Sequence, residues 1–224
     1  MITLHHLDNS RSQRILWLLE ELGVPYRIKC YQRDPKTMLA PAELRAIHPL
    51  GKSPVLSDGE LTLAESGAII EYLAGRYGEG RLLPPAGTPE RLRCSYWLHY
   101  AEGSAMPPLL LKLVLNRVRT APAPFFARPI ARSIADKVDR NFTDPQLKLH
   151  LDYLEGELGE REWFVGDALS AADIQLSFPL EAFAARGGLG GDSHPRLCAF
   201  LQRIHARPAY RRALEQGGPY RLGG

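Results

Sequence analysis

Four polar residues, Asn9-Ser10-Arg11-Ser12, follow a short alternating segment and precede an apolar helical pattern. This order predicts hydroxyl and amide groups at a helix N-terminus, where free backbone N–H groups and the helix dipole stabilise an anion. A thiol held there ionises more readily, and a hydroxyl that donates a hydrogen bond to the thiolate lowers the thiol pKa further. The alternative is that Ser10 or Ser12 only caps the helix.

A second polar segment, Gly51-Lys52-Ser53-Pro54-Val55, leads into a predicted strand, where a proline at the first position is tolerated. A cis Ser53-Pro54 bond would turn backbone groups of Ser53 or Val55 toward a peptide ligand, and an ordinary trans loop is the commoner alternative. Lys52 could meet a carboxylate, or it could simply be exposed to solvent.

A third polar segment, Glu65-Ser66-Gly67, opens another predicted helix. The Ser66 hydroxyl and the neighbouring N–H groups suit a carboxylate, and Glu65 could pair with an ammonium group. A plain helix cap is the alternative for this segment as well.

The elements that must position these segments follow from hydrophobic periodicity. Alternation over residues 2–6 and 26–30 predicts two strands, and i, i+3, i+4, i+7 spacing predicts a helix between them, so the strands should be parallel. A short helix near Leu39–Ile47, strands at residues 54–57 and 60–63 around a type I′ turn at Asp58-Gly59, and a helix ending at Gly78 come next. This βαβ-α-ββα order is that of the thioredoxin-like fold, but residues 9–14 lack the Cys-x-x-Cys pair of a dithiol oxidoreductase.

Beyond a Pro/Gly-rich stretch the pattern is entirely helical. We expect a thioredoxin-like domain over residues 1–80, a linker over 81–87 and an all-α domain over 88–224. The first helix expected in the second domain runs from Thr88 to about Val118, with a disturbance at Pro107-Pro108, and a second lies near Pro129–Asn141. A third begins at Asp144 and turns Leu147, Leu151, Leu154 and Leu158 inward, and a fourth runs from a Ser170–Asp173 capping box to Gly187-Gly188. The last two cover His194–Ala206 and Pro208–Gln216.

Composition excludes several classes of protein. The chain has 224 residues, 45% hydrophobic and 24% charged, with a net charge of +3 and no dense basic stripe, so we expect no nucleic-acid partner. Cys30, Cys94 and Cys198 form no metal motif and each is expected to be a buried structural thiol, so we expect no metal. The lack of an export signal or a long apolar run predicts a cytoplasmic protein without a membrane partner.

Together these segments resemble the cytosolic glutathione transferases, in particular a bacterial group related to the fungal Gtt-type transferases. The similarity lies in Leu7–Leu22, in His48–Val55, in Leu63–Ile69 and in Leu169–Ile174, which occur in the family's order across nearly the whole chain. The resemblance implies the glutathione-transferase architecture, an α/β thioredoxin-like N-terminal domain followed by an all-α helical domain. It also implies glutathione as co-substrate and a homodimer.

The resemblance also assigns roles to residues. It implies Glu65 and Ser66 for the γ-glutamyl end, Ser53, cis-Pro54 and Val55 for the cysteinyl unit, and Lys52 for the glycyl carboxylate. The spacing before Arg14-Ile15 that the resemblance implies for a thiol-activating serine falls on Asn9, with Ser10 next to it. We expect Ser10 to activate the thiol, with Asn9 as the main alternative and Ser12 or Arg11 as lesser ones; no tyrosine occupies this place. On the first long helix of the second domain the pocket for the electrophile would include Tyr96, His99, Tyr100, Ser104 and Met106. Asp173 is expected to be a structural cap.

Three functions follow in order of preference. The first is a glutathione S-transferase that activates the thiol for attack on small apolar electrophiles, a detoxification reaction. The second is a glutathione-dependent peroxidase or disulfide-bond reductase, which an Asn9-centred site would favour. The third is a non-catalytic protein that binds apolar ligands or recognises a partner.

Overall fold

A four-stranded mixed sheet forms the first part of the structure, a computed structural model that describes residues 1–35 and 37–222. The strands lie in the order β2-β1-β3-β4. β1 (Ile2–Leu7) pairs in parallel with β2 (Tyr26–Tyr31), and β3 (Val55–Asp58) pairs antiparallel with both β1 and β4 (Leu61–Ala64). The predicted parallel βαβ unit and antiparallel hairpin are therefore confirmed.

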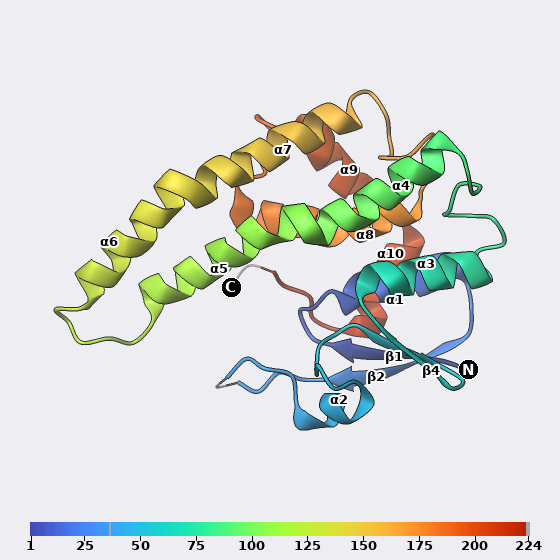
Figure 1. Ribbon diagram of the computed structural model, residues 1–224, viewed down its shortest axis with the longest axis horizontal. Helices are drawn as coiled ribbons and strands as arrows, with labels where there is room; N and C mark the ends of the chain where they lie inside the picture. Colours follow the sequence, from blue (N-terminus) through green and yellow to red (C-terminus); the bar gives the residue numbers. More distant parts are fainter. Residues whose placement is uncertain (36, 223–224) are drawn as a thin grey trace.

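Three helices complete the N-terminal domain. α1 (Ser12–Leu22) and α3 (Ser66–Tyr77) lie together on one face of the sheet, and the short α2 (Ala42–Ile47) lies on the other side (Figure 1). α1 ends at Gly23, whose φ of 68° is the left-handed conformation that glycine adopts without a steric penalty. The order of elements is the predicted βαβ-α-ββα, which confirms the thioredoxin-like fold of this domain.

The hairpin turn differs from the prediction. Asp58 pairs with Leu61, so the two loop residues are Gly59 and Glu60 rather than Asp58 and Gly59. Of these two only Gly59 has a positive φ, at 62°, whereas a type I′ turn needs positive φ at both positions. Alternation of apolar residues therefore located the strands, but the register moved the turn by one residue.

Long helices form the all-α C-terminal domain, as predicted. Their bounds are α4 (Pro89–Tyr100), the π-helical turn η1 (Ala101–Ala105), α5 (Met106–Thr120), α6 (Arg128–Val138), η2 (Asp139–Thr143), α7 (Asp144–Leu158), α8 (Ala171–Ala182), η3 (Phe183–Gly187), α9 (Pro195–Ala206) and α10 (Pro208–Gly217). α10 packs against α1, and α5 and α6 form a long hairpin that projects from the body of the molecule (Figure 1).

The disturbance predicted at Pro107-Pro108 lies one turn earlier, in η1. The two prolines cannot donate to the carbonyls four residues before them, at Gly103 and Ser104, and these residues lie within the π-helical turn. The gap expected between residues 141 and 144 is likewise a π-helical turn, η2, rather than a break between helices.

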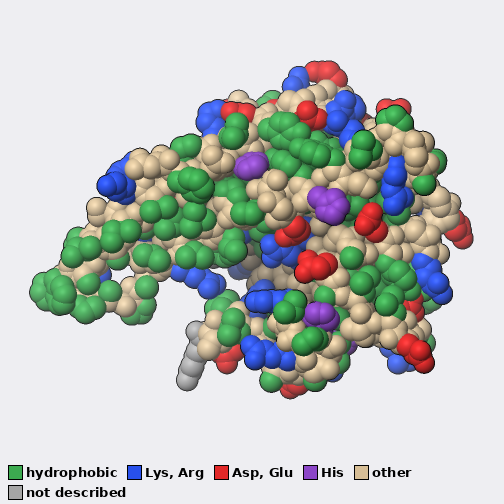
Figure 2. All heavy atoms as spheres, viewed as in Figure 1, with side chains coloured by type: hydrophobic (Ala, Val, Ile, Leu, Met, Phe, Trp, Pro, Cys, Tyr) green, Lys and Arg blue, Asp and Glu red, His purple; other side chains and the backbone are tan. Residues whose placement is uncertain are grey.

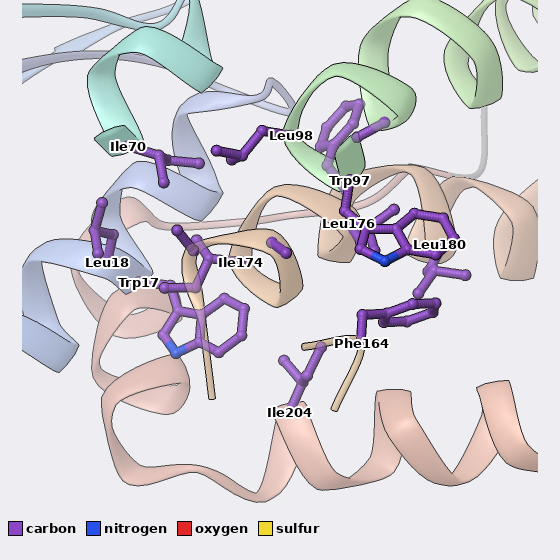
Figure 3. Packing of buried hydrophobic residues seen from close by; sticks show 14 of the residues in the cluster. Trp17, Leu18, Ile70, Trp97, Leu98, Phe164, Ile174, Leu176, Leu180 and Ile204 are labelled. Atoms are coloured by element: carbon purple, nitrogen blue, oxygen red, sulfur yellow. The ribbon is translucent and has the colours of Figure 1, made fainter. Parts of the chain in front are cut away.

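The largest hydrophobic cluster runs without interruption between the two domains. Figure 3 shows Trp17 and Leu18 of α1 and Ile70 of α3 facing Leu98 of α4 and Ile174 of α8. Trp17, Leu18, Ile70 and Ile174 are fully buried, so the two domains share one core and the start of α1 is held rigidly against the helical domain.

The cysteine environments correct part of the prediction. Cys94 is buried and burial raises the pKa of its thiol to about 11, which fits a structural thiol. Cys30 is exposed on the edge strand β2 and Cys198 is half-buried, so neither is the fully buried thiol that was expected. Among the described residues no helix is long and apolar enough to cross a membrane.

The start of α8 is a fully buried cap. Asp173 accepts hydrogen bonds from the backbone N–H groups of Ser170 and Phe164, both at 2.8 Å, and from the Ser170 hydroxyl at 2.7 Å. Burial raises the pKa of Asp173 to about 6 even though these hydrogen bonds favour the carboxylate. The predicted structural role of this residue is supported by its geometry, since all its contacts are within the helical domain.

We expect Asp173→Ala to lower the free energy of unfolding by about 2–4 kcal/mol, because it removes a helix cap and leaves two buried N–H groups without a partner. Urea denaturation at pH 7.5 measures the change. Asp167→Ala, at an exposed position six residues earlier, is the matched control and should change stability by less than about 0.5 kcal/mol. Equal losses in the two variants would contradict a capping role.

Candidate active site at the start of helix α1

Three serines meet just before the first turn of α1. The Ser10 hydroxyl oxygen lies 2.8 Å from that of Ser12 and 3.3 Å from that of Ser53, and it accepts a hydrogen bond from the Ser12 backbone N–H at 3.2 Å. The Ser53-Pro54 peptide bond is cis, in agreement with the prediction. The loop before α1 and the loop before β3 thus form one polar cluster beside a helix N-terminus.

Ser12 is the inner member of this cluster. Its side chain is fully buried, lies 2.8 Å from the His6 Nδ1 atom and donates to the Leu7 carbonyl at 3.2 Å. Burial lowers the pKa of His6, although the Gly217 carbonyl and the Asp8 charge oppose this. Ser12 therefore fixes the turn between β1 and α1, whereas Ser10 is the serine that lies toward the second loop.

Asn9 has a different environment. Its backbone has a φ of 47°, the left-handed region in which asparagine is tolerated, and its side chain is exposed. The Asn9 side-chain oxygen accepts a hydrogen bond of 2.6 Å from the backbone N–H of Arg221, in the segment after α10. The end of the chain therefore runs past the start of α1 (Figure 1).

A buried guanidinium links Ser66 to the helical domain. Arg14 of α1 is 1% exposed, and it donates to the Ser66 hydroxyl at 2.5 Å, to the Gln175 carbonyl at 2.7 Å and to the Glu102 carboxylate. Arg11 forms a second ion pair with Glu102, its Nε atom lying 2.9 Å from each carboxylate oxygen. Burial raises the pKa of Glu102, but the two guanidinium groups outweigh burial and the pKa is lowered overall.

The remaining predicted residues of the N-terminal domain lie within two residues of Ser53 or Ser66 in the sequence. Glu65, immediately before α3, is exposed and has φ and ψ of 66° and 114°, a conformation that non-glycine residues rarely adopt outside functional sites. Val55 is fully buried at the start of β3, opposite His5 of β1 and Ala64 of β4. Lys52 is exposed beside the serine cluster.

Comparisons with known proteins bear directly on this arrangement. The family model for the glutathione S-transferase N-terminal domain matches residues 10–76, and that for the glutathione S-transferase C-terminal domain matches residues 124–208. The chain is 35% identical to glutathione S-transferase 1 of Saccharomyces cerevisiae, over 96% of this chain and 95% of the yeast protein. The chain belongs to the glutathione S-transferase family.

Solved structures agree with this assignment. A glutathione S-transferase from Actinobacillus pleuropneumoniae matches with a TM-score of 0.77 and 36% identity, covering 99% of this chain and 94% of the other. A sphingomonad glutathione S-transferase complexed with glutathione matches with a TM-score of 0.73 and 26% identity, covering 96% and 98%. The expected architecture, the glutathione transferase function and the resemblance to the fungal group are therefore confirmed.

The residues expected in the pocket for the electrophile of this transferase lie along α4, η1 and the start of α5. Tyr96 and Tyr100 face α7, their hydroxyls 2.8 Å from that of Tyr153 and 2.6 Å from His150 Nδ1, and Met106 is buried in the core. The assignment of these residues to the pocket for the electrophile therefore stays a prediction. His99 is exposed, Ser104 is half-buried, and no contact recorded for the described residues links either to Ser10.

Sequence reasoning missed Glu102, the residue of η1 that pairs with Arg11 and Arg14. It also missed Arg14 and Gln175, because both were counted as ordinary members of helical patterns. One signal was present: Arg14 is a cation directly before Ile15-Leu16-Trp17-Leu18-Leu19, within a helix buried on most of its surface. A charge in such a helix needs a buried partner, and a search for an unpaired acid in the helical domain could have suggested one.

We expect Glu102→Gln to lower the free energy of unfolding of this transferase by about 1–3 kcal/mol, because it leaves the buried Arg14 guanidinium without a counter-charge while part of Glu102 remains open to solvent. Chemical denaturation at pH 7.5 measures the change. Glu215→Gln, at an exposed position of α10, is the control and should have little effect. A loss no larger than that of the control would mean that the ion pair contributes nothing measurable.

Proposed function

We propose that the Ser10 hydroxyl stabilises the thiolate of glutathione, which then attacks small apolar electrophiles. The observation that carries the proposal is the hydrogen bonding of Ser10 at the N-terminal end of α1. Its oxygen accepts from the Ser12 N–H, and its hydroxyl lies 2.8 Å from Ser12 Oγ and 3.3 Å from Ser53 Oγ. When glutathione binds, the Ser10 proton turns from these serine oxygens to the sulfur anion, and the helix dipole favours the same charge.

The environment of Ser66 supports a role for it at the γ-glutamyl carboxylate. Arg14 and Gln175 both donate to the Ser66 hydroxyl oxygen, at 2.5 and 3.5 Å, so the hydroxyl proton is left for another acceptor. Glu65 precedes it with an exposed carboxylate that suits the γ-glutamyl ammonium group. In the same proposal Ser53, Pro54 and Val55 meet the cysteinyl unit, and the exposed Lys52 meets the glycyl carboxylate.

Other features of the proposed enzyme are those of the family. We propose a cytoplasmic homodimer without a metal, a nucleic-acid partner or a membrane partner, with domains divided at residues 80 and 88 and the second running to residue 224. Residues 36, 223 and 224 lie outside the described residues. A dimer is supported by large apolar side chains exposed on helices of the second domain, among them Leu92, Leu110, Val114 and Leu149.

A second candidate reaction, reduction of peroxides or mixed disulfides, is favoured by one observation. Because the Asn9 side-chain oxygen is occupied by the Arg221 N–H, its NH₂ group is the free end and can donate to a sulfur. In that case Asn9, not Ser10, would stabilise the thiolate.

We expect Ser10→Ala to raise the apparent pKa of enzyme-bound glutathione by about 1–2 units, because a hydrogen bond to a charged group is worth about 1.5–3 kcal/mol. Thiolate absorbance against pH measures this apparent pKa, with Asn9→Ala as the competing variant and Ser95→Ala on α4 as the control.

A shift in Asn9→Ala alone would transfer the role to Asn9, and rates with an aryl chloride, an organic peroxide and a mixed disulfide would then decide the reaction. Failure of the wild type to bind glutathione in calorimetry would leave a non-catalytic protein.

A further inference from the structure

Arginines from both domains converge on the loop before α1. Arg33, in the segment after β2, donates from Nε to the Asp8 carbonyl at 3.3 Å and from Nη2 to the Asn9 carbonyl at 3.4 Å. The Arg221 backbone is bonded to the Asn9 side chain, and Arg11 begins the turn that leads into α1. Two arginines, Arg33 and Arg221, thus bond to the loop that carries the proposed thiol site, and a third, Arg11, belongs to it.

Two more arginines reach the same place from the helical domain. Arg186 of η3 donates to the Leu222 carbonyl at 2.7 Å, which places it next to the chain segment that carries Arg221. Burial lowers the pKa of Arg186 and the charge of Arg11 lowers it further. Burial also lowers the pKa of Arg33, and the charges of Arg117 and Arg11 add to this effect, whereas the Asp8 charge opposes it. Arg117 of α5 is therefore within electrostatic range of Arg33, which contacts the loop before α1.

The carboxylates nearby do not balance these cations. Glu102 is shared between Arg11 and Arg14, and Asp8 is the acid whose charge acts on Arg33. Over residues 1–35 and 37–222 no carboxylate lies within ion-pair distance of Arg33, Arg117, Arg186 or Arg221. Guanidinium groups without a carboxylate partner leave an excess of positive charge, with which a bound anion could pair.

The position of this excess charge relative to the proposed glutathione site indicates which ligand would carry the anion. Figure 2 shows a recess between the α5–α6 hairpin and the N-terminal domain, with Lys and Arg side chains on both of its walls. Glutathione's own carboxylates are assigned above to Ser66, the first residue of α3, and to Lys52, in the loop before β3. Arg117 and Arg186 instead come from the helical domain, which supplies the pocket for the second substrate.

We propose that the second substrate of this enzyme is an electrophile with an apolar body and an anionic group, such as a carboxylate, bound by Arg117 and Arg33 across the recess. The proposal rests on the proposed function. With an aryl chloride, the glutathione thiolate attacks the carbon that bears chlorine, a C–S bond forms, and chloride leaves with the electron pair of the broken C–Cl bond. The thiol proton has gone to solvent beforehand, so the reaction needs no oxidant or reductant.

A matched pair of substrates tests the proposal. 4-Chloro-3-nitrobenzoate is anionic and 4-chloro-3-nitrobenzamide is neutral, and both lose chloride from a carbon activated by the same ortho nitro group. Each kcat/KM is divided by the uncatalysed rate constant with glutathione at the same pH, which removes the difference in intrinsic reactivity. We expect this ratio to be about tenfold higher for the benzoate in the wild-type enzyme, because a charge-assisted hydrogen bond is about twice as strong as a neutral one.

Arg117→Gln is the informative variant, because the Arg117 side chain is exposed and forms no hydrogen bond or ion pair among the described residues, so the fold does not depend on it. We expect it to remove most of the preference for the benzoate through a higher KM for that substrate. Arg132→Gln, an exposed arginine of α6 that also lacks a recorded partner, is the control and should keep the preference. The wild-type preference should also fall as salt is raised from about 0.05 to 0.5 M.

Three outcomes would overturn the proposal. The first is a wild-type enzyme that accelerates the benzamide reaction but shows no preference for the benzoate, a result that leaves the proposed function intact. The second is an equal loss of preference in the Arg117 and Arg132 variants. The third is an Arg117→Gln enzyme whose KM for glutathione rises equally with both electrophiles, which would assign the cations to glutathione itself. No acceleration with either substrate would contradict the proposed function instead.

Discussion

The Arg14 guanidinium is the point on which the relative placement of the two domains and the candidate site depends. It is buried at 1% exposure in α1, and its partners come from three other elements: Ser66 from α3, Glu102 from η1 and Gln175 from α8. A buried charge without partners would cost several kcal/mol, so these partners must stay in place together for the chain to be folded. One such partner, Ser66, is also a residue proposed to hold glutathione, which makes the ligand site part of the domain interface.

The π-helical turn η1 makes this network possible. Glu102 lies in the middle of the long helix formed by α4, η1 and α5, and a π-helical turn changes the direction in which side chains leave the helix. The helix segment before it uses Trp97 and Leu98 to pack on the shared core, and the segment after it carries Arg117 into the projecting hairpin. The two prolines at the start of α5 account for the irregular turn in terms of missing backbone donors. The irregular turn that the two prolines cause therefore carries Glu102, the acid that links the two domains.

Much of the fold could be predicted from the sequence, because periodicity reports burial directly. The strands β1 and β2, the amphipathic α1 and the Ser170–Asp173 cap followed from patterns a few residues long. Candidate site residues could be proposed from the sequence only where suitable side chains stand at helix starts, as at Ser10 and Ser66. Arg14, Glu102 and Gln175 were missed because their pairings join distant parts of the chain: Glu102 is 88 residues and Gln175 is 161 residues from Arg14. A single sequence does not report such pairings. Tyr96 and Tyr100 were expected in the pocket because they are aromatic, and their place there stays a prediction. In the structure they stack on each other, and Tyr100 packs against Tyr153 of α7.

The excess of positive charge at the start of α1 follows from the way in which the two domains meet. The network needs cations at Arg11 and Arg14, and Glu102 neutralises only part of their charge. The end of the chain adds its own arginine when Arg221 passes Asn9, and it is held there by Arg186 through a backbone carbonyl rather than through a carboxylate. A thiolate formed beside Ser10 would lie next to this positive field and be stabilised by it over distances longer than a hydrogen bond. The same field would attract an anionic second substrate toward the thiolate, and the arginines would offset the repulsion between two anions brought together in one site. Stabilisation of the nucleophile and selection of the electrophile can therefore arise from one set of cations, because both depend on the excess of arginine that the domain junction leaves at the start of α1.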